Sequence, residues 1–181
     1  MTEASVDGFG KGYSQFRGDV IKYGHWKPRS CIARSRVVII IPYRKRPEHL
    51  RHWLAHYHPI LQRQMIEYRI VVAEQFGSEL FNKGRLMNAA FIECKKAFDF
   101  DCVIFHDVDL LLQDDRNMYW CYNLTSPRHL SPAVSKFKYK LPYKKLVGGV
   151  LAFTKKQFKA VNGYSNEFWG WGGEDDDMAE R

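Results

Sequence analysis

The stretch Cys102-Val103-Ile104-Phe105-His106-Asp107-Val108-Asp109 places an apolar run directly before two acidic residues. Four successive apolar residues at Cys102–Phe105 are typical of a strand that is buried on both faces of a sheet. Because side chains alternate along an extended backbone, Asp107 and Asp109 are expected to point the same way. We therefore predict a buried strand that ends in two carboxylates.

Strand and helix patterns alternate on both sides of this stretch. Further strands are predicted at Val37–Ile41 (ended by Pro42), Tyr68–Ala73 and Gly149–Phe153. Helices are predicted over Glu48–Gln64, Leu86–Phe98 and Lys155–Val161. This alternation predicts an α/β fold with a mostly parallel sheet flanked by helices. Ligands of such sheets bind beyond the carboxyl ends of the strands.

The chain has the length of one domain. It contains 181 residues, 45% of them hydrophobic, which is enough to bury a sizeable core. Residues 1–30 contain glycines among polar residues without a clear period, so we predict an irregular N-terminal arm there. Residues 31–181 are predicted to form the folded domain.

A net charge of +8 and a pI near 9.3 indicate an anionic partner, such as nucleic acid, a membrane surface or a nucleoside diphosphate. Small basic clusters lie at 44–46, 136–140 and 144–145, with no helix-turn-helix, zinc-finger or RNA-binding motif beside them. We therefore do not expect a nucleic-acid partner. No run reaches the roughly 18 apolar residues of a membrane span, and no signal-peptide pattern is present.

Two loops that follow predicted strands carry candidate site residues. Arg44 and Arg46 suit phosphate contacts and Tyr43 suits stacking on a base, although a solvated basic loop explains the same residues. Asp107 and Asp109 are hard oxygen donors that suit Mg²⁺ or Mn²⁺ bound to a diphosphate. Asp-x-Asp triplets also occur in solvated turns, so this motif alone leaves both interpretations open.

The segment Phe168-Trp169-Gly170-Trp171-Gly172-Gly173-Glu174-Asp175-Asp176-Asp177 is the most informative one. Glycines around tryptophans suit a mobile lid that offers a flat apolar face to a sugar ring. Four acids that open a helix agree with its dipole. Because such runs are rare, we favour a second interpretation, in which one acid is a general base with a raised pKa.

Histidines and cysteines give weaker signals. His52 and His56 have i,i+4 spacing and His58 follows, but a third ligand and a paired glutamate are missing, so we predict a solvated helix face. The four cysteines lack CxxC spacing, which argues against a structural zinc site and leaves thiols and disulfides open. Asn123-Leu124-Thr125 is a glycosylation sequon, which has meaning only in the secretory pathway.

Taken together, these motifs resemble the β-1,4-galactosyltransferase family in order and approximate spacing, from about Gly24 to Arg181. The matching stretches are Ile40–Leu50, Phe81-Asn82-Lys83, Asp107–Leu110, Gly148-Gly149-Val150 and Trp169–Asp177. The resemblance implies a GT-A fold and an inverting transfer of a sugar from a UDP-sugar to a terminal GlcNAc-type acceptor, with formation of a β-1,4 linkage. Residues 31–181 would then be a partial glycosyltransferase catalytic domain.

The resemblance also implies roles for individual residues. Asp175 matches the catalytic base, and Asp109 matches a Mn²⁺ ligand. The donor (UDP) side comprises Pro42, Tyr43, Arg44, Arg46, Phe81, Lys83, Asp107, Val108 and Asp109. The acceptor side comprises Tyr143, Trp171, Gly172, Gly173 and Asp176. Lys83 stands where the family usually has Arg, which keeps the charge but loses bidentate contact with phosphate.

The implied disulfide joins Cys102 to Cys121, which suits an oxidising compartment, and the family implies the Golgi lumen. Cys94 is expected to be a buried thiol, and Cys31 resembles a family cysteine whose partner we do not find.

Leu146 bears on the choice of donor. The galactose-transferring vertebrate members have Tyr at this position, whereas the smaller residue is similar to invertebrate members that transfer GalNAc. A shorter side chain leaves room for an N-acetyl group. The expected donor is therefore UDP-GalNAc, with UDP-Gal as the runner-up, and the expected acceptor is a GlcNAc-terminated glycan.

The family completes its metal site with a Met and a His beyond the acidic motif, and its full-length members carry an N-terminal membrane anchor. Neither is found in this sequence, so we expect a C-terminally truncated form with Asp109 as its sole matched metal ligand. The alternative is a non-catalytic form that only binds UDP or glycan, or an inactive fragment.

Overall fold

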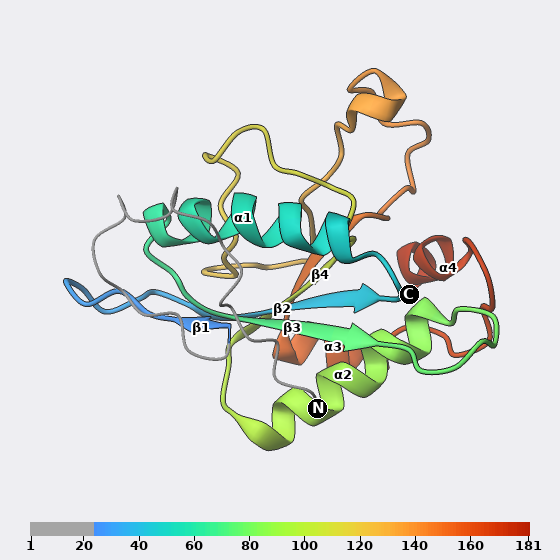
Figure 1. The fold of residues 1–181 in the computed structure, drawn as a ribbon, viewed down its shortest axis with the longest axis horizontal. Coiled ribbons are helices and arrows are strands. Elements are labelled where there is room, and N and C mark those ends of the chain that lie inside the picture. Colours follow the sequence, from blue (N-terminus) through green and yellow to red (C-terminus); the bar gives the residue numbers. More distant parts are fainter. Residues whose placement is uncertain (1–23) are drawn as a thin grey trace.

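A computed structural model describes residues 24–181, and these contain one six-stranded sheet (Figure 1). The strands are β1 (His25–Trp26), β2 (Arg36–Tyr43), β3 (Glu67–Glu74), β4 (Cys102–His106), β5 (Arg128–His129) and β6 (Val150–Thr154). Their order across the sheet is β1-β3-β2-β4-β6-β5. The helices are α1 (Pro47–Arg63), α2 (Lys83–Ala97), α3 (Lys155–Ala160) and α4 (Glu174–Glu180), and a 3₁₀ turn, η2, spans Ser135–Phe137.

The sheet is mixed, although its centre is parallel as the sequence predicts. Strand β2 pairs in parallel with β3 on one side and β4 on the other. Strands β1, β6 and β5 join with antiparallel pairing. No long helix separates β4 from β6 in the described chain, and an antiparallel neighbour needs no crossover helix.

The alternation of side chains in β2 creates two cores, one on each face of the sheet. Val37, Ile39 and Ile41 pack on the α1 side, where Trp53, Tyr57 and Leu61 are buried. Val38 and Ile40 face the other side, together with Met87 and Phe91 of α2 and Phe158 of α3. Figure 1 shows α1 on one face of the sheet and α2 with α3 on the other. Because side chains alternate along a strand that is buried on both faces, β2 packs against the helices on both sides of the sheet.

Pro42 does not end β2, contrary to the prediction. The strand continues to Tyr43, with Pro42 opposite Ala73 of β3. On its other side, β2 pairs with β4 only as far as Ile40. Because no neighbour requires an N–H group there, a proline is tolerated in the strand.

The predicted irregular arm at 1–30 lies mostly outside the described residues. Within its described part, His25–Trp26 forms β1 against β3, which corrects the prediction for these two residues. Trp26 is buried and its ring stacks on Tyr68 with a centroid distance of 5.8 Å. Over residues 24–181, no helix combines the length and the apolar character needed to cross a membrane.

Candidate functional site

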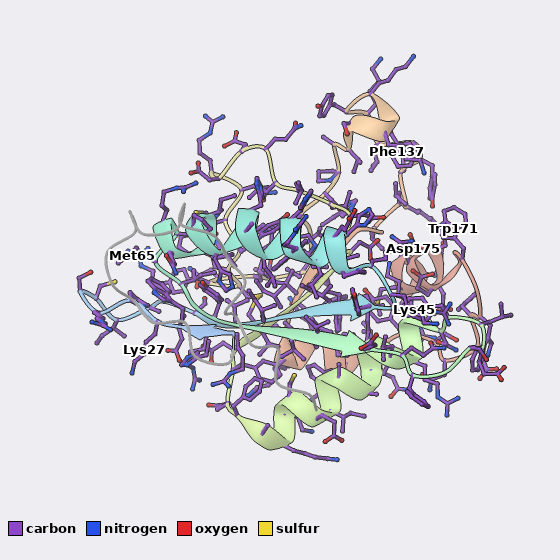
Figure 2. All side chains as sticks on the ribbon, viewed as in Figure 1. Lys27, Lys45, Met65, Phe137, Trp171 and Asp175 are labelled. Atoms are coloured by element: carbon purple, nitrogen blue, oxygen red, sulfur yellow. A yellow bond between two sulfur atoms is a disulfide. The ribbon has the colours of Figure 1, made fainter. Side chains whose placement is uncertain are left out.

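The carboxyl end of β4 and the start of β6 meet at one edge of the sheet. Antiparallel pairing places His106 opposite Val150, and the Asp107 N–H donates to the Gly149 carbonyl at 2.9 Å. Asp107 and Asp109 therefore lie on a turn just beyond β4 rather than on the strand itself. Figure 2 shows Asp175, Lys45 and Trp171 at the same end of the molecule, toward which β2 and β3 point.

Lys83 connects the two acidic motifs of this edge. It is the first residue of α2, and its Nζ lies 2.7 Å from Asp107 Oδ1 and 3.1 Å from Glu174 Oε1. Burial favours the neutral amine, but the charges of Asp107 and Glu174 outweigh this effect and raise the pKa of Lys83. Burial raises the pKa of Asp107, and Lys83 offsets part of that rise. Sequence reasoning assigned Lys83 to the diphosphate; the structure places it between two carboxylates.

Asp175 lies in the first turn of α4 and packs against Gly148. A Cβ atom at Gly148 would overlap the Asp175 carboxylate, so only glycine fits there without a shift. Burial, followed by the charge of Glu174, raises the pKa of Asp175. A carboxylate with a raised pKa is suited to taking a proton at neutral pH.

These residues share one pocket. Its lining includes Lys83, Asp107, Gly148, Tyr164 and Asp175. The acids of α4 open a helix, as the simpler of the two interpretations predicts, and the base role of one of them stays a prediction. They also bring Asp175 into a pocket that Asp107, Glu174 and Lys83 line as well.

The lid-like segment before α4 is held by the start of α2. Asn82 Nδ2 donates to the Asn166 carbonyl at 2.7 Å, and Asn88 Nδ2 donates to the Tyr164 carbonyl at 2.8 Å. The Gly170 N–H donates to the Phe81 carbonyl at 2.8 Å. Sequence reasoning quoted Asn82 in a matching stretch without giving it this role, and it missed Asn88; Asn82 is also the N-cap residue of α2. Trp171 is 97% exposed, so its flat face is free for a ligand.

The basic loop after β2 lies at the same edge. Arg46 Nη1 is 3.0 Å from Asp109 Oδ2, and this ion pair joins the basic loop to the Asp107–Asp109 turn. Arg44 lies over the Phe81 ring at 5.2 Å and donates to the Glu79 carbonyl at 2.5 Å. Tyr43 is largely buried in the core on the α1 side, which leaves little of its ring for stacking on a base.

A hydrogen-bonded cluster of buried polar side chains lies next to the Asp107–Asp109 turn. Trp53 Nε1 donates to His106 Nδ1 at 3.1 Å, and the same Nδ1 lies 2.8 Å from the Asp107 carbonyl. The other ring nitrogen, Nε2, is 3.0 Å from the Tyr119 hydroxyl. Tyr119 donates to the Tyr57 hydroxyl at 3.2 Å, and Tyr57 donates to the Leu110 carbonyl at 3.3 Å. Burial lowers the pKa of His106 to about 3, so the ring stays neutral. Sequence reasoning missed this cluster.

The pocket lining does not include the expected acceptor-side residues, although Gly173 and Asp176 are the chain neighbours of its lining residues Glu174 and Asp175. The Tyr143 hydroxyl donates to Asp176 Oδ1 at 2.7 Å, and this bond raises the pKa of Tyr143 to about 12. Leu146, the expected selectivity residue, is half-buried two residues before Gly148. Val147, Gly148 and Gly149 line the pocket itself.

The cysteines and histidines have clear places in the fold. Cys102 and Cys121 form a disulfide, as the resemblance implies. Cys94 is a buried thiol whose pKa burial raises to about 11, and Cys31 is exposed. The predicted solvated histidine face is wrong for two of its three members, because these bond to other elements. His56 donates to the Leu112 carbonyl at 2.7 Å, and His58 lies 2.7 Å from the Tyr68 hydroxyl.

The described residues supply part of a metal donor set. Asp107 and Asp109 are hard oxygen donors of the type that Mg²⁺ and Mn²⁺ prefer, and both already attract a cationic side chain. Between residues 24 and 181, no group of three His, Cys, Asp or Glu side chains could hold a metal ion. A divalent ion at this edge would therefore need further ligands, such as diphosphate oxygens.

Comparison with known families and proteins agrees with these features. The model for the N-terminal region of glycosyl transferase group 7 matches residues 10–122, and the model for the N-terminal domain of galactosyltransferase matches residues 128–181. The chain is 49% identical to mouse β-1,4-galactosyltransferase 1 over 158 residues, covering 87% of this chain and 39% of that protein. It is 46% identical to mouse β-1,4-galactosyltransferase 5 over 182 residues, covering 100% of this chain and 46% of that protein.

A relative from Lymnaea stagnalis carries a different activity in its name. It is called a β-N-acetyl-D-glucosaminide β-1,4-N-acetylglucosaminyltransferase, and it is 51% identical over 163 residues, covering 90% of this chain and 33% of that protein. The chain thus spans less than half the length of these three relatives.

Among solved structures, a variant of Drosophila β-1,4-galactosyltransferase 7 in complex with manganese, UDP-Gal and xylobiose matches with a TM-score of 0.72. Its sequence identity is 34%, and the match covers 80% of this chain and 59% of that one.

Proposed function

Because the chain belongs to the β-1,4-galactosyltransferase family of glycosyltransferases, we propose that its strand edge forms the donor site and carries the catalytic base of an inverting sugar transfer. The donor is a UDP-sugar with GalNAc or Gal, and the acceptor is a terminal GlcNAc-type sugar that gains a β-1,4 linkage. The observation that carries this proposal is the pocket in which Asp175, Asp107 and Lys83 meet.

In the proposed reaction, Asp175 takes the proton from the acceptor hydroxyl. The acceptor oxygen then attacks the anomeric carbon as the bond to the diphosphate breaks, so that the configuration at that carbon inverts and UDP leaves. Burial and Glu174 raise the pKa of Asp175, which makes it a better base for this step than an exposed aspartate.

The cationic residues at the strand edge support binding of the donor. Arg46 and Lys83 each pair with an aspartate at the edge where we propose that the diphosphate binds. Asp109, supported by Asp107, would hold Mn²⁺, which when bound supplies positive charge beside the leaving diphosphate. Trp171 would cover the acceptor sugar with its exposed ring.

The identity of the transferred sugar rests on Leu146. A side chain shorter than Tyr leaves room for an N-acetyl group, which favours UDP-GalNAc over UDP-Gal. The relative named for N-acetylglucosaminyl transfer has an identity similar to that of the named galactosyltransferases. Sequence identity therefore does not select the donor, and UDP-GlcNAc belongs in the donor panel. The disulfide and the family favour the Golgi lumen as the compartment.

Transfer assays test the proposal. The chain is incubated with Mn²⁺, a chitobiose acceptor and each of the three UDP-sugars, and the product linkage is read by NMR. We expect Asp175→Asn to lower kcat by a factor of about 100 or more while UDP affinity is kept. Asp177→Asn is the matched control, because Asp177 pairs with Arg181. Equal loss in both variants would contradict a base role for Asp175.

One observation favours a second function, in which the chain binds UDP or glycan without transfer. Residues 24–181 contain no complete metal-ligand group, and a cation held by few carboxylates binds weakly. UDP binding that does not respond to Mn²⁺, together with an absence of transfer, would support that function instead.

A further inference from the structure

Residues 135–145, here called the lysine–aromatic segment, form an exposed projection between β5 and β6. In Figure 1 this part of the chain stands away from the sheet, and Figure 2 shows Phe137 near its tip. The segment contains no acidic residue and five lysines, which are Lys136, Lys138, Lys140, Lys144 and Lys145. All five are exposed. The proposed reaction at Asp175 makes no use of them.

Hydrogen bonds hold the backbone of the lysine–aromatic segment in one conformation. Turn η2 is closed by the Lys138 N–H donating to the Ser135 carbonyl at 2.9 Å, and the Tyr139 N–H donates to the Val134 carbonyl at 3.0 Å. Lys138 and Tyr139 both adopt positive φ, at 53° and 58°, a conformation that non-glycine residues rarely adopt. Gln113 Nε2 donates to the Tyr139 hydroxyl at 3.1 Å, which ties the projection to the loop after β4.

Lysines and aromatic rings alternate along this backbone. Phe137, Tyr139 and Tyr143 are 41%, 54% and 46% exposed. Of the five lysines, Lys145 pairs with Glu180 at 2.5 Å. The other four have no carboxylate within ion-pair distance among residues 24–181, so the segment presents unneutralised positive charge beside exposed rings.

The segment leads directly into the pocket. Tyr143 donates to Asp176, the neighbour of Asp175, and Val147 lines the pocket four residues later. A molecule whose end lies at Asp175 would therefore extend along the projection.

We propose that the lysine–aromatic segment binds the inner residues of an anionic glycan acceptor, one that bears sulfate or uronate groups behind its terminal sugar. Lysine ammonium groups pair with the sulfates or carboxylates, and the rings lie against the C–H faces of the sugars. This inference rests on the proposed function, because it takes the Asp175 pocket as the place of the terminal sugar.

The pattern favours a glycan over an anionic membrane. A membrane-surface element gathers its apolar side chains on one face and its basic ones on the other. Here the rings and the ammonium groups alternate along a turn, which suits a chain that presents sugar faces and charges in succession.

Direct binding tests the proposal without any need for transfer. The probes are fluorescently labelled chitohexaose and its 6-O-sulfated form, titrated with the whole chain in the absence of UDP-sugar and metal. We expect the sulfated probe to bind more tightly, with a preference that weakens as salt is raised, since exposed ion pairs are screened. The triple variant Lys136→Gln, Lys138→Gln, Lys140→Gln should bind the sulfated probe about tenfold more weakly, given the usual strength of three exposed pairs. Its affinity for the neutral probe should be unchanged.

A matched triple variant tests whether binding depends on the lysine–aromatic segment or only on the net charge of the chain. Lys95→Gln, Lys156→Gln, Lys159→Gln removes three exposed lysines of α2 and α3, and it should retain the affinity for the sulfated probe within about twofold. Phe137→Ala should weaken binding of both probes. Circular dichroism and Tm verify that each variant folds.

Three outcomes would overturn the proposal. These are equal affinity of the wild-type chain for the two probes, equal loss of sulfated-probe binding in the two triple variants, and tighter lysine-dependent binding of phosphatidylserine vesicles or a single-stranded oligonucleotide. Loss of transfer in Asp175→Asn has no bearing on these results. Transfer to chitobiose without any preference for the sulfated probe would overturn this inference and leave the proposed function standing.

Discussion

Lys83 Nζ lies 2.7 Å from Asp107 Oδ1, so the start of α2 delivers a positive charge to the turn at the end of β4. The same ammonium reaches Glu174 of α4 at 3.1 Å. One lysine thus joins three segments that are far apart in the sequence. Both pairs are largely shielded from solvent, where removal of one partner leaves an uncompensated charge.

Replacement of Lys83 is therefore expected to destabilise the fold. Lys83→Met should lower the free energy of unfolding by about 3 kcal/mol, because Asp107 and Glu174 lose their shared cation. Lys83→Arg, which keeps the charge, should cost less. Urea unfolding followed by circular dichroism measures both. A Lys83→Met variant as stable as the wild type would show that the ion pairs contribute nothing net.

The contact between Gly148 and Asp175 predicts a steric effect on function. Gly148→Ala places a methyl group where the Asp175 carboxylate lies, so the carboxylate must move. We expect transfer to fall by about 100-fold, since misplacing a catalytic group by about 1 Å has that order of effect. Gly77→Ala is a useful control for glycine loss, because nothing lies within 4 Å of a Cβ there, although its φ of 90° strains that variant as well. Full activity in Gly148→Ala would contradict the assigned position of Asp175.

The buried cluster below the Asp107–Asp109 turn predicts a stability effect. Tyr119→Phe leaves the buried His106 Nε2 without its hydrogen-bond partner and should cost about 1–3 kcal/mol. Tyr122→Phe, at a half-exposed ring, should change stability by less than about 0.5 kcal/mol. Thermal unfolding compares the two variants. Similar Tm values for both would show that the hydrogen bond is not needed.

The raised pKa of Asp175 predicts the pH dependence of transfer. A base acts only when deprotonated, so kcat should fall as pH drops through the pKa of Asp175, which lies above the usual aspartate value. The effect on folding has the opposite direction. Because the folded state binds this proton more tightly than the unfolded chain, the contribution of Asp175 to stability is largest at low pH and is lost as pH rises through its folded pKa. A pH–rate profile with its acid limb at the usual aspartate pKa would contradict the raised value.

Much of the fold could be predicted because its main strands carry unbroken apolar runs. The Val37–Ile41 run and the stripe along α1 were sufficient to place both elements. The two-residue strands β1 and β5 carry no pattern of their own, and they exist because a neighbouring strand offers an edge. The antiparallel direction of β6 depends on the path of the long loop after β4, which has no periodicity to interpret.

The motifs of the candidate site could be predicted from the sequence, but the contacts between their residues could not. The Asp107–Asp109 turn and the acids of α4 stand out in the sequence, and both lie at the pocket or beside it. That Lys83 lies between them, or that Asn88 holds the backbone of Tyr164, depends on how distant segments pack. The close approach of Gly148 to the Asp175 carboxylate likewise depends on how α4 packs, and the Gly148-Gly149-Val150 motif alone does not reveal it.

The most direct test of the donor site is calorimetry of UDP binding to the whole chain, with and without Mn²⁺. We predict that UDP binding tightens when Mn²⁺ is present, is weakened by Asp109→Asn and is unaffected by Asp177→Asn. UDP binding that is absent in a folded chain, or that is indifferent to both Mn²⁺ and Asp109, would contradict the assignment of this edge as a metal-assisted UDP-sugar site.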